Sequence, residues 1–235
     1  LQQLNAEQTL NHIRHTLVNE LQQTANSTQG NVEQFLSNEM KKGNVKEYTS
    51  FFIVNGFAVT ANKEIAEKLL SFPEVKSVLL DEVKELEPVN TAELSKLIQE
   101  KAASDEVEWH IERIKAPEVW EKGYTGEGIV VANIDSGVDG DHPALKTKYR
   151  GYNPEDPNNP NHEFNWFDPA AGRSIPLDSD GHGTHTMGTM VGYEEGMTKI
   201  GVAPGAKWIA ARAFYLGTAY DSNIIDAGQW VLAPT

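Results

Sequence analysis

The chain has no cysteine, which excludes disulfide bonds, thiol catalysis and thiolate metal sites. It also has no run approaching 18 apolar residues, so no membrane-spanning helix is expected. Basic residues are scarce, since 20 Lys and Arg stand against 34 Asp and Glu and give a net charge of −14. This charge argues against nucleic acid or an anionic membrane as the main partner.

The chain also lacks the usual marks of a protein start, because its first residue is Leu1 and no apolar signal core follows. Either nothing targets the chain or a targeting segment has been removed. What is present suffices for folding: 235 residues, 39% of them hydrophobic, can form one large domain or two smaller ones.

The first eighty residues predict a small α+β domain. Apolar residues spaced by three or four predict a helix over residues 10–21, and a polar break follows over residues 25–30. Asn31 is then a candidate cap for a second helix, with Gln34 as its partner in a capping box.

A hairpin, a further helix and a further strand are expected next. Asn55-Gly56 between two apolar runs predicts a hairpin over residues 48–60, with positive φ at both turn residues. Residues 63–72 predict a helix and residues 75–80 a strand. The helix residues expected to point inward are Ile65, Leu69 and Leu70.

This order of elements matches a ferredoxin-like β-α-β-β-α-β unit without its first strand. We therefore expect the chain to begin just after that strand. Residues 81–108 are rich in acidic side chains and predict a linker, which is interpreted as solvated surface with a weak helix over residues 91–102.

From Trp109 onward the pattern is α/β. Continuous apolar runs over residues 129–134 and 207–214 predict parallel strands, the first of them buried on both faces. Helices are expected between and after the strands, which predicts a partial doubly wound, mostly parallel sheet. The expected helices cover residues 117–120, 183–191 and 222–232, and residues 153–169 are expected to form a surface loop.

Two residues stand where such sheets bind ligands. Asp135 ends the predicted strand over residues 129–134, and ligands collect at the carboxyl ends of parallel strands. His182 stands at the start of a predicted helix, with Gly181 and Gly183 leaving its flanks open. An imidazole can act as a general base near neutral pH. Each residue alone also fits a structural role, as a turn cap or as a satisfied core histidine.

His185 completes an H-x-x-H pattern with His182, which leaves a zinc site open as an alternative. The pattern is weak, because no Glu follows the first histidine, no cysteine exists and no third ligand is evident. A metal-dependent hydrolase that uses Asp135, His182 and His185 stays the less favoured hypothesis.

Three blocks together resemble the subtilisin-like serine proteases. They are Ile134-Asp-Ser-Gly-Val-Asp139, the segment from Asp180-Gly-His-Gly-Thr-His185 to Gly188-Thr189, and Gly201-Val-Ala-Pro-Gly-Ala206. This resemblance covers the chain from Trp109 onward. The part up to Pro88 resembles the inhibitory propeptide of the same family, most clearly in Phe51-Phe-Ile-Val-Asn-Gly56.

The resemblance implies roles for particular residues. Asp135 would orient His182, and His182 would be the general base of a Ser-His-Asp triad. The edge formed by Gly217, Thr218, Ala219 and Tyr220 would pair with an extended peptide substrate. The family's nucleophile block matches no serine of the chain, so we expect a fragment that is inactive by itself.

No cofactor is expected from the resemblance. Many members have a calcium-ligating Asp directly after His-Pro, whereas here Ala144 follows His142-Pro143. Calcium in the full-length enzyme stays possible. Other acidic residues could bind it, but loops rich in Asp and Asn are usually polar surface. These residues are Asp156, Asp168, Asp178 and Asp180.

The resemblance thus implies a secreted serine endopeptidase precursor that acts on polypeptides, with its propeptide contacting the catalytic domain. The expected domains are a propeptide over residues 1–88, an acidic processing linker over residues 89–106 and the N-terminal half of a catalytic domain over residues 107–235. Cleavage is expected between Pro88 and Asp105, in the exposed linker. The alternative is a propeptide that works only as an inhibitor and folding chaperone.

Overall fold

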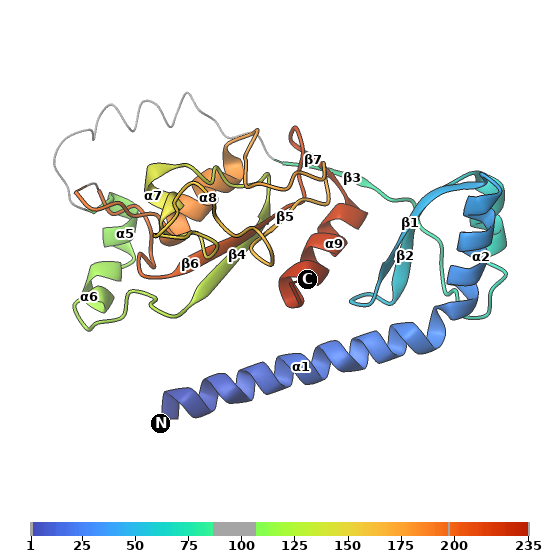
Figure 1. Cartoon of the computed structure of the whole chain (residues 1–235), viewed down its shortest axis with the longest axis horizontal. Coiled ribbons are helices and arrows are strands. Elements are labelled where there is room, and N and C mark those ends of the chain that lie inside the picture. Colours follow the sequence, from blue (N-terminus) through green and yellow to red (C-terminus); the bar gives the residue numbers. More distant parts are fainter. Residues whose placement is uncertain (1, 87–106, 197, 235) are drawn as a thin grey trace. The chain divides into compact units, whose positions relative to one another are not determined.

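A computed structural model describes residues 2–86, 107–196 and 198–234, and of residues 2–10 it describes the backbone alone (Figure 1). The chain forms two compact units, which are described separately. Unit 1 contains residues 1–82 together with 228–233, and unit 2 contains residues 83–227 together with 234–235.

Unit 1 consists of helices and one antiparallel hairpin. In chain order it contains α1 (Gln2–Thr28), α2 (Gly30–Lys41), β1 (Val45–Phe51), β2 (Gly56–Ala61) and α3 (Lys63–Leu69). Strands β1 and β2 pair antiparallel, and α2 packs against β1. The buried apolar residues between helices and hairpin are Val32, Leu36, Val45, Ile65 and Leu69.

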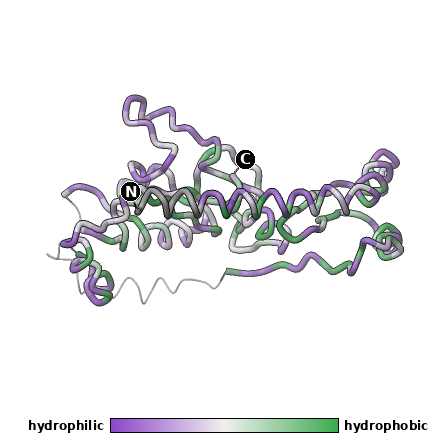
Figure 2. The backbone as a smooth tube through the Cα atoms, turned by 90° about the horizontal axis from the view of Figure 1, so that it is seen from below, coloured by the Kyte–Doolittle hydropathy of each residue, from purple (hydrophilic) through white to green (hydrophobic). Residues whose placement is uncertain are grey.

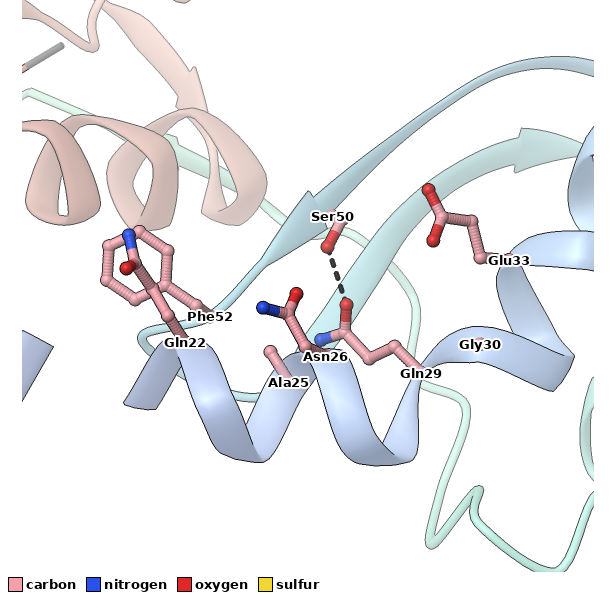
Figure 3. A pocket seen from close by; sticks show the side chains of 8 residues that line it. All are labelled: Gln22, Ala25, Asn26, Gln29, Gly30, Glu33, Ser50 and Phe52. Atoms are coloured by element: carbon pink, nitrogen blue, oxygen red, sulfur yellow. Dashed lines mark hydrogen bonds between the residues drawn. The ribbon is translucent and has the colours of Figure 1, made fainter. Parts of the chain in front are cut away.

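Helix α1 extends into the break predicted over residues 25–30 and ends at Thr28, so only Gln29 separates it from α2. The Gln29 side chain is directed to the hairpin. Its Nε2 donates to Phe51 O at 3.0 Å. Its Oε1 accepts from Ser50 Oγ at 2.6 Å, the bond that Figure 3 shows. The predicted Asn31 cap is wrong, because α2 has already begun at Gly30 and Asn31 donates to Glu74 instead.

The predicted hairpin is confirmed, although its turn differs from the expected two-residue form. Asn55 has a φ of 47°, as expected, but Gly56 is the first residue of β2 and does not have positive φ. The turn is longer because β1 ends at Phe51. In α3, Ile65 and Leu69 are buried as predicted, whereas Leu70 lies beyond the helix end and is 56% exposed.

The strand predicted over residues 75–80 is not present. Leu79 and Leu80 are 83% and 85% exposed. A strand needs a neighbour to satisfy its backbone groups, and within the part of unit 1 that the structure describes the sheet consists of β1 and β2 alone. The expected helix over residues 91–102 lies outside the described residues.

Unit 2 is an α/β unit built around a parallel sheet with the order β4-β6-β5. Its strands are β3 (Val83–Glu85), β4 (Val130–Asp135), β5 (Trp166–Phe167), β6 (Lys207–Arg212) and β7 (Thr218–Tyr220). Its helices are α5 (Trp109–Arg113), α6 (Ala116–Trp120), α7 (Pro143–Lys146), α8 (His182–Val191) and α9 (Asp221–Leu232), the last of which continues into residues of unit 1.

The core of unit 2 is centred on β6. Trp208 is fully buried, stacks on Tyr149 with ring centroids 4.5 Å apart, and donates from Nε1 to Leu145 O at 2.8 Å. Helix α8 packs against β4 and β6 (Figure 1). Strand β4 is less buried than predicted, since Val130 at its start is 41% exposed.

Helix α1, with 27 residues, is the longest helix of the described chain. Its colour in Figure 2 changes repeatedly between polar and apolar, because its apolar residues form a stripe and not a continuous run. Among the residues that the structure describes, none of the helices combines the length and the apolar character needed to cross a bilayer.

Candidate active site

The carboxyl end of β4 and the first turn of α8 meet in unit 2. Asp135 is the last residue of β4, and His182 is the first residue of α8. Their backbones approach closely at Gly183, where an added Cβ would lie 2.0 Å from Gly137 O. Only glycine allows this approach, so the small residues around His182 bring the helix start onto the strand end.

The two predicted residues are in contact. His182 Nδ1 lies 2.7 Å from Asp135 Oδ1, which is a hydrogen-bond distance. The Asp135 side chain is 10% exposed and that of His182 is 27% exposed. The imidazole is therefore held on one edge by a mostly buried carboxylate and keeps access to solvent elsewhere.

The carboxylate of Asp135 has two further partners. Ser136 N donates to Oδ1 at 2.6 Å, and Thr186 Oγ1 lies 3.1 Å from Oδ2. An ionised carboxylate only accepts hydrogen bonds, so the shared proton belongs to His182 Nδ1. In a neutral imidazole this leaves the Nε2 lone pair free to accept a proton from another group.

Sequence reasoning missed two supporting residues. Thr186 stands four residues after His182 and hence on the same face of α8, a spacing that could have indicated it. Asn133 stands two residues before Asp135, on the same face of β4. Its Nδ2 donates to Gly183 O at 3.2 Å, so this buried amide also joins the strand to the helix start.

The predicted substrate edge, Gly217 to Tyr220, is a second candidate functional region of unit 2. Residues Thr218–Tyr220 are β7, which pairs antiparallel with β3. The pairs are Val83 with Tyr220, Lys84 with Ala219 and Glu85 with Thr218. Leu86 N also donates to Gly217 O at 2.9 Å, so residues 83–86 lie along this edge as an added strand.

A tight turn connects this edge to the strand beside Asp135. Strand β6 pairs with β4 so that Arg212 lies opposite Asp135, and Phe214 N donates to Asp135 O at 3.1 Å. Tyr215 and Thr218 then exchange two backbone hydrogen bonds around Gly217, whose φ is +78°. The edge thus follows directly from the segment that holds the backbone of Asp135.

Two of the four acidic residues considered for metal binding, Asp168 and Asp178, have other partners. Asp168 forms a buried ion pair with Arg212 at 2.7 Å, and the carboxylate of Asp178 accepts hydrogen bonds from its own loop and from α8. His185 is exposed on α8, and Ala144 is buried in α7. Within the described ranges, no group of three His, Asp or Glu side chains could hold a metal ion.

Two known families match separate parts of the chain. The subtilase family matches residues 126–234, and the peptidase inhibitor I9 family matches residues 3–87. The first match contains Asp135, His182 and β7. The second contains α1 from residue 3 onward, α2, the β1–β2 hairpin, α3 and β3.

Individual relatives are similar to most of this chain. Bacillopeptidase F of Bacillus subtilis is 48% identical over 98% of this chain, which corresponds to 16% of that protein. Minor extracellular protease Vpr of the same organism is 32% identical over 80% of this chain and 22% of its own length. Subtilisin E is 31% identical over 82% of this chain and 42% of its own length. The chain therefore spans less than half of the length of each of these relatives, and its residues 126–234 are similar to the subtilase family.

Proposed function

We propose that the chain is part of a serine endopeptidase precursor that cleaves polypeptides with a Ser-His-Asp triad. The observation that carries the proposal is the 2.7 Å hydrogen bond between His182 Nδ1 and Asp135 Oδ1. It fixes the tautomer in which Nε2 can accept a proton, which is the arrangement that a triad requires.

The proposed chemistry follows from this tautomer. His182 Nε2 takes the proton of a serine hydroxyl as the oxygen attacks the peptide carbonyl, and later gives that proton to the leaving amine. The imidazolium formed in between is stabilised by the carboxylate of Asp135. The serine is not assigned to any residue of this chain.

We further propose that β7 binds the substrate. Its pairing with residues 83–86 supports this role, because an extended peptide would form the same backbone hydrogen bonds with Gly217, Thr218, Ala219 and Tyr220. Ala219 is buried, whereas Thr218 and Tyr220 are exposed, so main-chain groups and outward side chains are both available at this edge.

The same pairing favours a second function, inhibition by the propeptide. Residues 3–87 match an inhibitor family, and the last described residues of that match occupy the proposed substrate edge. We propose that residues 1–88 are this inhibitory and folding-assisting domain, with cleavage in the linker between Pro88 and Asp105. Two relatives are named extracellular proteases, which supports secretion.

Covalent labelling of the full-length protein with a fluorophosphonate probe tests the triad. The probe reacts with a serine that a histidine base activates. His182→Ala should abolish labelling. His185→Ala is the matched control, because it removes a second histidine from the exposed side of the same helix and should leave labelling intact.

The control also separates this proposal from the metal-dependent alternative. A metal hydrolase that uses Asp135, His182 and His185 would lose its activity in His185→Ala and after treatment with a chelator. Labelling that persists in His182→Ala, or activity that depends on His185 and a metal, would contradict the triad.

A further inference from the structure

A second carboxylate lies next to the Asp135–His182 pair and takes no part in the proposed proton transfer. Asp178 Oδ1 accepts from Ser136 Oγ at 2.9 Å, Asp180 N at 3.0 Å and Gly181 N at 2.9 Å. Oδ2 accepts from Thr184 N at 2.8 Å and Thr184 Oγ1 at 2.6 Å. A carboxylate has about four lone-pair sites, so this one is saturated by protein donors.

These donors come from the immediate neighbours of the two triad residues. Ser136 directly follows Asp135, and Thr184 comes two residues after His182. Asp178 therefore connects the turn that carries the carboxylate of the pair with the helix turn that carries its imidazole. Gly137 and Asp178 also form an isolated backbone bridge, so main chain and side chain join the same segments.

Two further hydrogen bonds close the network. Ser136 Oγ accepts from Gly183 N at 2.9 Å while it donates to Asp178, so its hydroxyl links strand end and helix start by itself. Thr184 Oγ1 accepts from Asp139 N at 3.0 Å while it donates to Asp178. Each of these two hydroxyls both donates and accepts a hydrogen bond, which fixes its own orientation and that of the Asp178 carboxylate.

We infer that Asp178 is a positioning residue, which holds Asp135 and His182 at hydrogen-bonding distance by clamping Ser136 and Thr184. The inference rests on the proposed function for the role of the pair, but the contacts that carry it are independent of catalysis. A displacement of about 1 Å in a catalytic pair can reduce the rate by roughly a hundredfold, so a clamp of this kind affects turnover without touching substrate.

The charge state of Asp178 supports this arrangement. Burial opposes its ionisation, but the hydrogen bonds from Thr184, Gly181 and Asp180 together outweigh burial and hold the pKa of its carboxyl below the ordinary value. The charged form is also favoured at the N-terminal turn of a helix, where backbone N–H groups point outward. Asp178 is therefore an ionised acceptor at neutral pH, which the clamp requires.

Nuclear magnetic resonance of the 235-residue chain, with histidines labelled by nitrogen-15, tests the inference without any need for catalysis. The readout is the His182 Nδ1–H proton, which a hydrogen bond to Asp135 shifts downfield and protects from exchange. Asp178→Asn keeps the shape of the side chain but replaces one carboxylate oxygen with an N–H₂ group. This group cannot accept the hydrogen bonds that the surrounding donors offer. We expect this variant to keep its fold and to lose the protected Nδ1–H signal.

The matched control is Asp180→Asn, which removes the same charge from an exposed residue of the same loop. It should keep the signal. A second pair tests the other end of the clamp: Thr184→Val removes the hydroxyl and should lose the signal, whereas Thr184→Ser retains the hydroxyl and should restore it. This rescue separates a positioning role from general destabilisation.

Kinetics of the full-length protease give the functional readout. Asp178→Asn should lower kcat by about tenfold or more with KM within about twofold, because the change acts on the reacting groups and not on substrate binding. The inference is wrong if Asp178→Asn and Thr184→Val fold and both keep the protected signal. It is equally wrong if both variants unfold as a whole, since Asp178 would then serve the fold alone.

Discussion

The two units use apolar segments in opposite ways. In unit 2, every residue of β6 from Trp208 to Arg212 is buried between two neighbouring strands. In unit 1, Leu79 and Leu80 belong to an equally apolar segment and are almost fully exposed. The difference lies in the neighbours: an apolar run becomes a strand only where another strand can accept its hydrogen bonds.

Polar groups show the same contrast. The carboxylates of unit 2 that matter most, Asp135 and Asp178, are at least half-buried and accept several hydrogen bonds each. In unit 1, helix α3 has two exposed ion pairs, Lys63 with Glu67 at 3.5 Å and Lys68 with Glu64 at 3.0 Å. Unit 2 should therefore respond strongly to changes of buried groups and of pH.

The largest effect is expected from the core of unit 2. Trp208→Ala removes a fully buried side chain that stacks on Tyr149, and should lower the free energy of unfolding by about 3–5 kcal/mol. Leu80→Ala removes an exposed apolar side chain and should change it by no more than about 0.5 kcal/mol. Urea denaturation of both variants measures the contrast, and similar losses would show that Leu80 is buried in solution.

Acid should weaken unit 2 through Asp178. Its folded pKa lies below the ordinary value, so its ionised form stabilises the fold above the unfolded pKa of about 3.9. This stability is lost as the pH falls from near 4 through the lower folded pKa. In Asp178→Asn, the free energy of unfolding should therefore fall less steeply below about pH 4. Urea midpoints measured at several pH values check this, and an unchanged acid slope would contradict it.

The smallest effect is expected at the β3–β7 edge. Lys84 Nζ lies 3.6 Å from Asp221 Oδ1, and both side chains are partly exposed, so the pair contributes less than about 1 kcal/mol. Lys84→Glu should speed exchange of the Leu86 N–H, which donates to Gly217 O, by no more than about fivefold. Lys63→Glu makes the same charge change in unit 1 and should leave that exchange rate unaltered.

The sequence predicted the candidate site better than it predicted unit 1. The site could be predicted from short-range signals, because a strand end, a helix start and a close backbone approach each require particular residue types. These residues are Asp135, His182 and the glycines around them. Short-range turn chemistry also predicted the hairpin at Asn55. These signals depend on residues that are near one another in the chain.

What the sequence did not reveal depends on distant partners. Asn31 has the composition of a helix cap, yet Gln29 reaches the hairpin and α2 starts earlier. The run over residues 75–80 has strand composition but no neighbouring strand among the described residues. Asp178 was interpreted as polar surface because its donors, Ser136 and Thr184, are brought to it only by the fold.

The central claim, that Asp135 holds His182 as a general base, is tested most directly by Asp135→Asn in the full-length protease. An amide at this position donates to the imidazole and reverses its tautomer, so Nε2 can no longer accept a proton. We predict that kcat for a peptide substrate falls by about 10⁴-fold with little change in KM, a magnitude known from triads of other proteins, subtilisin among them. A variant that keeps kcat within about tenfold of the unaltered enzyme would contradict the account.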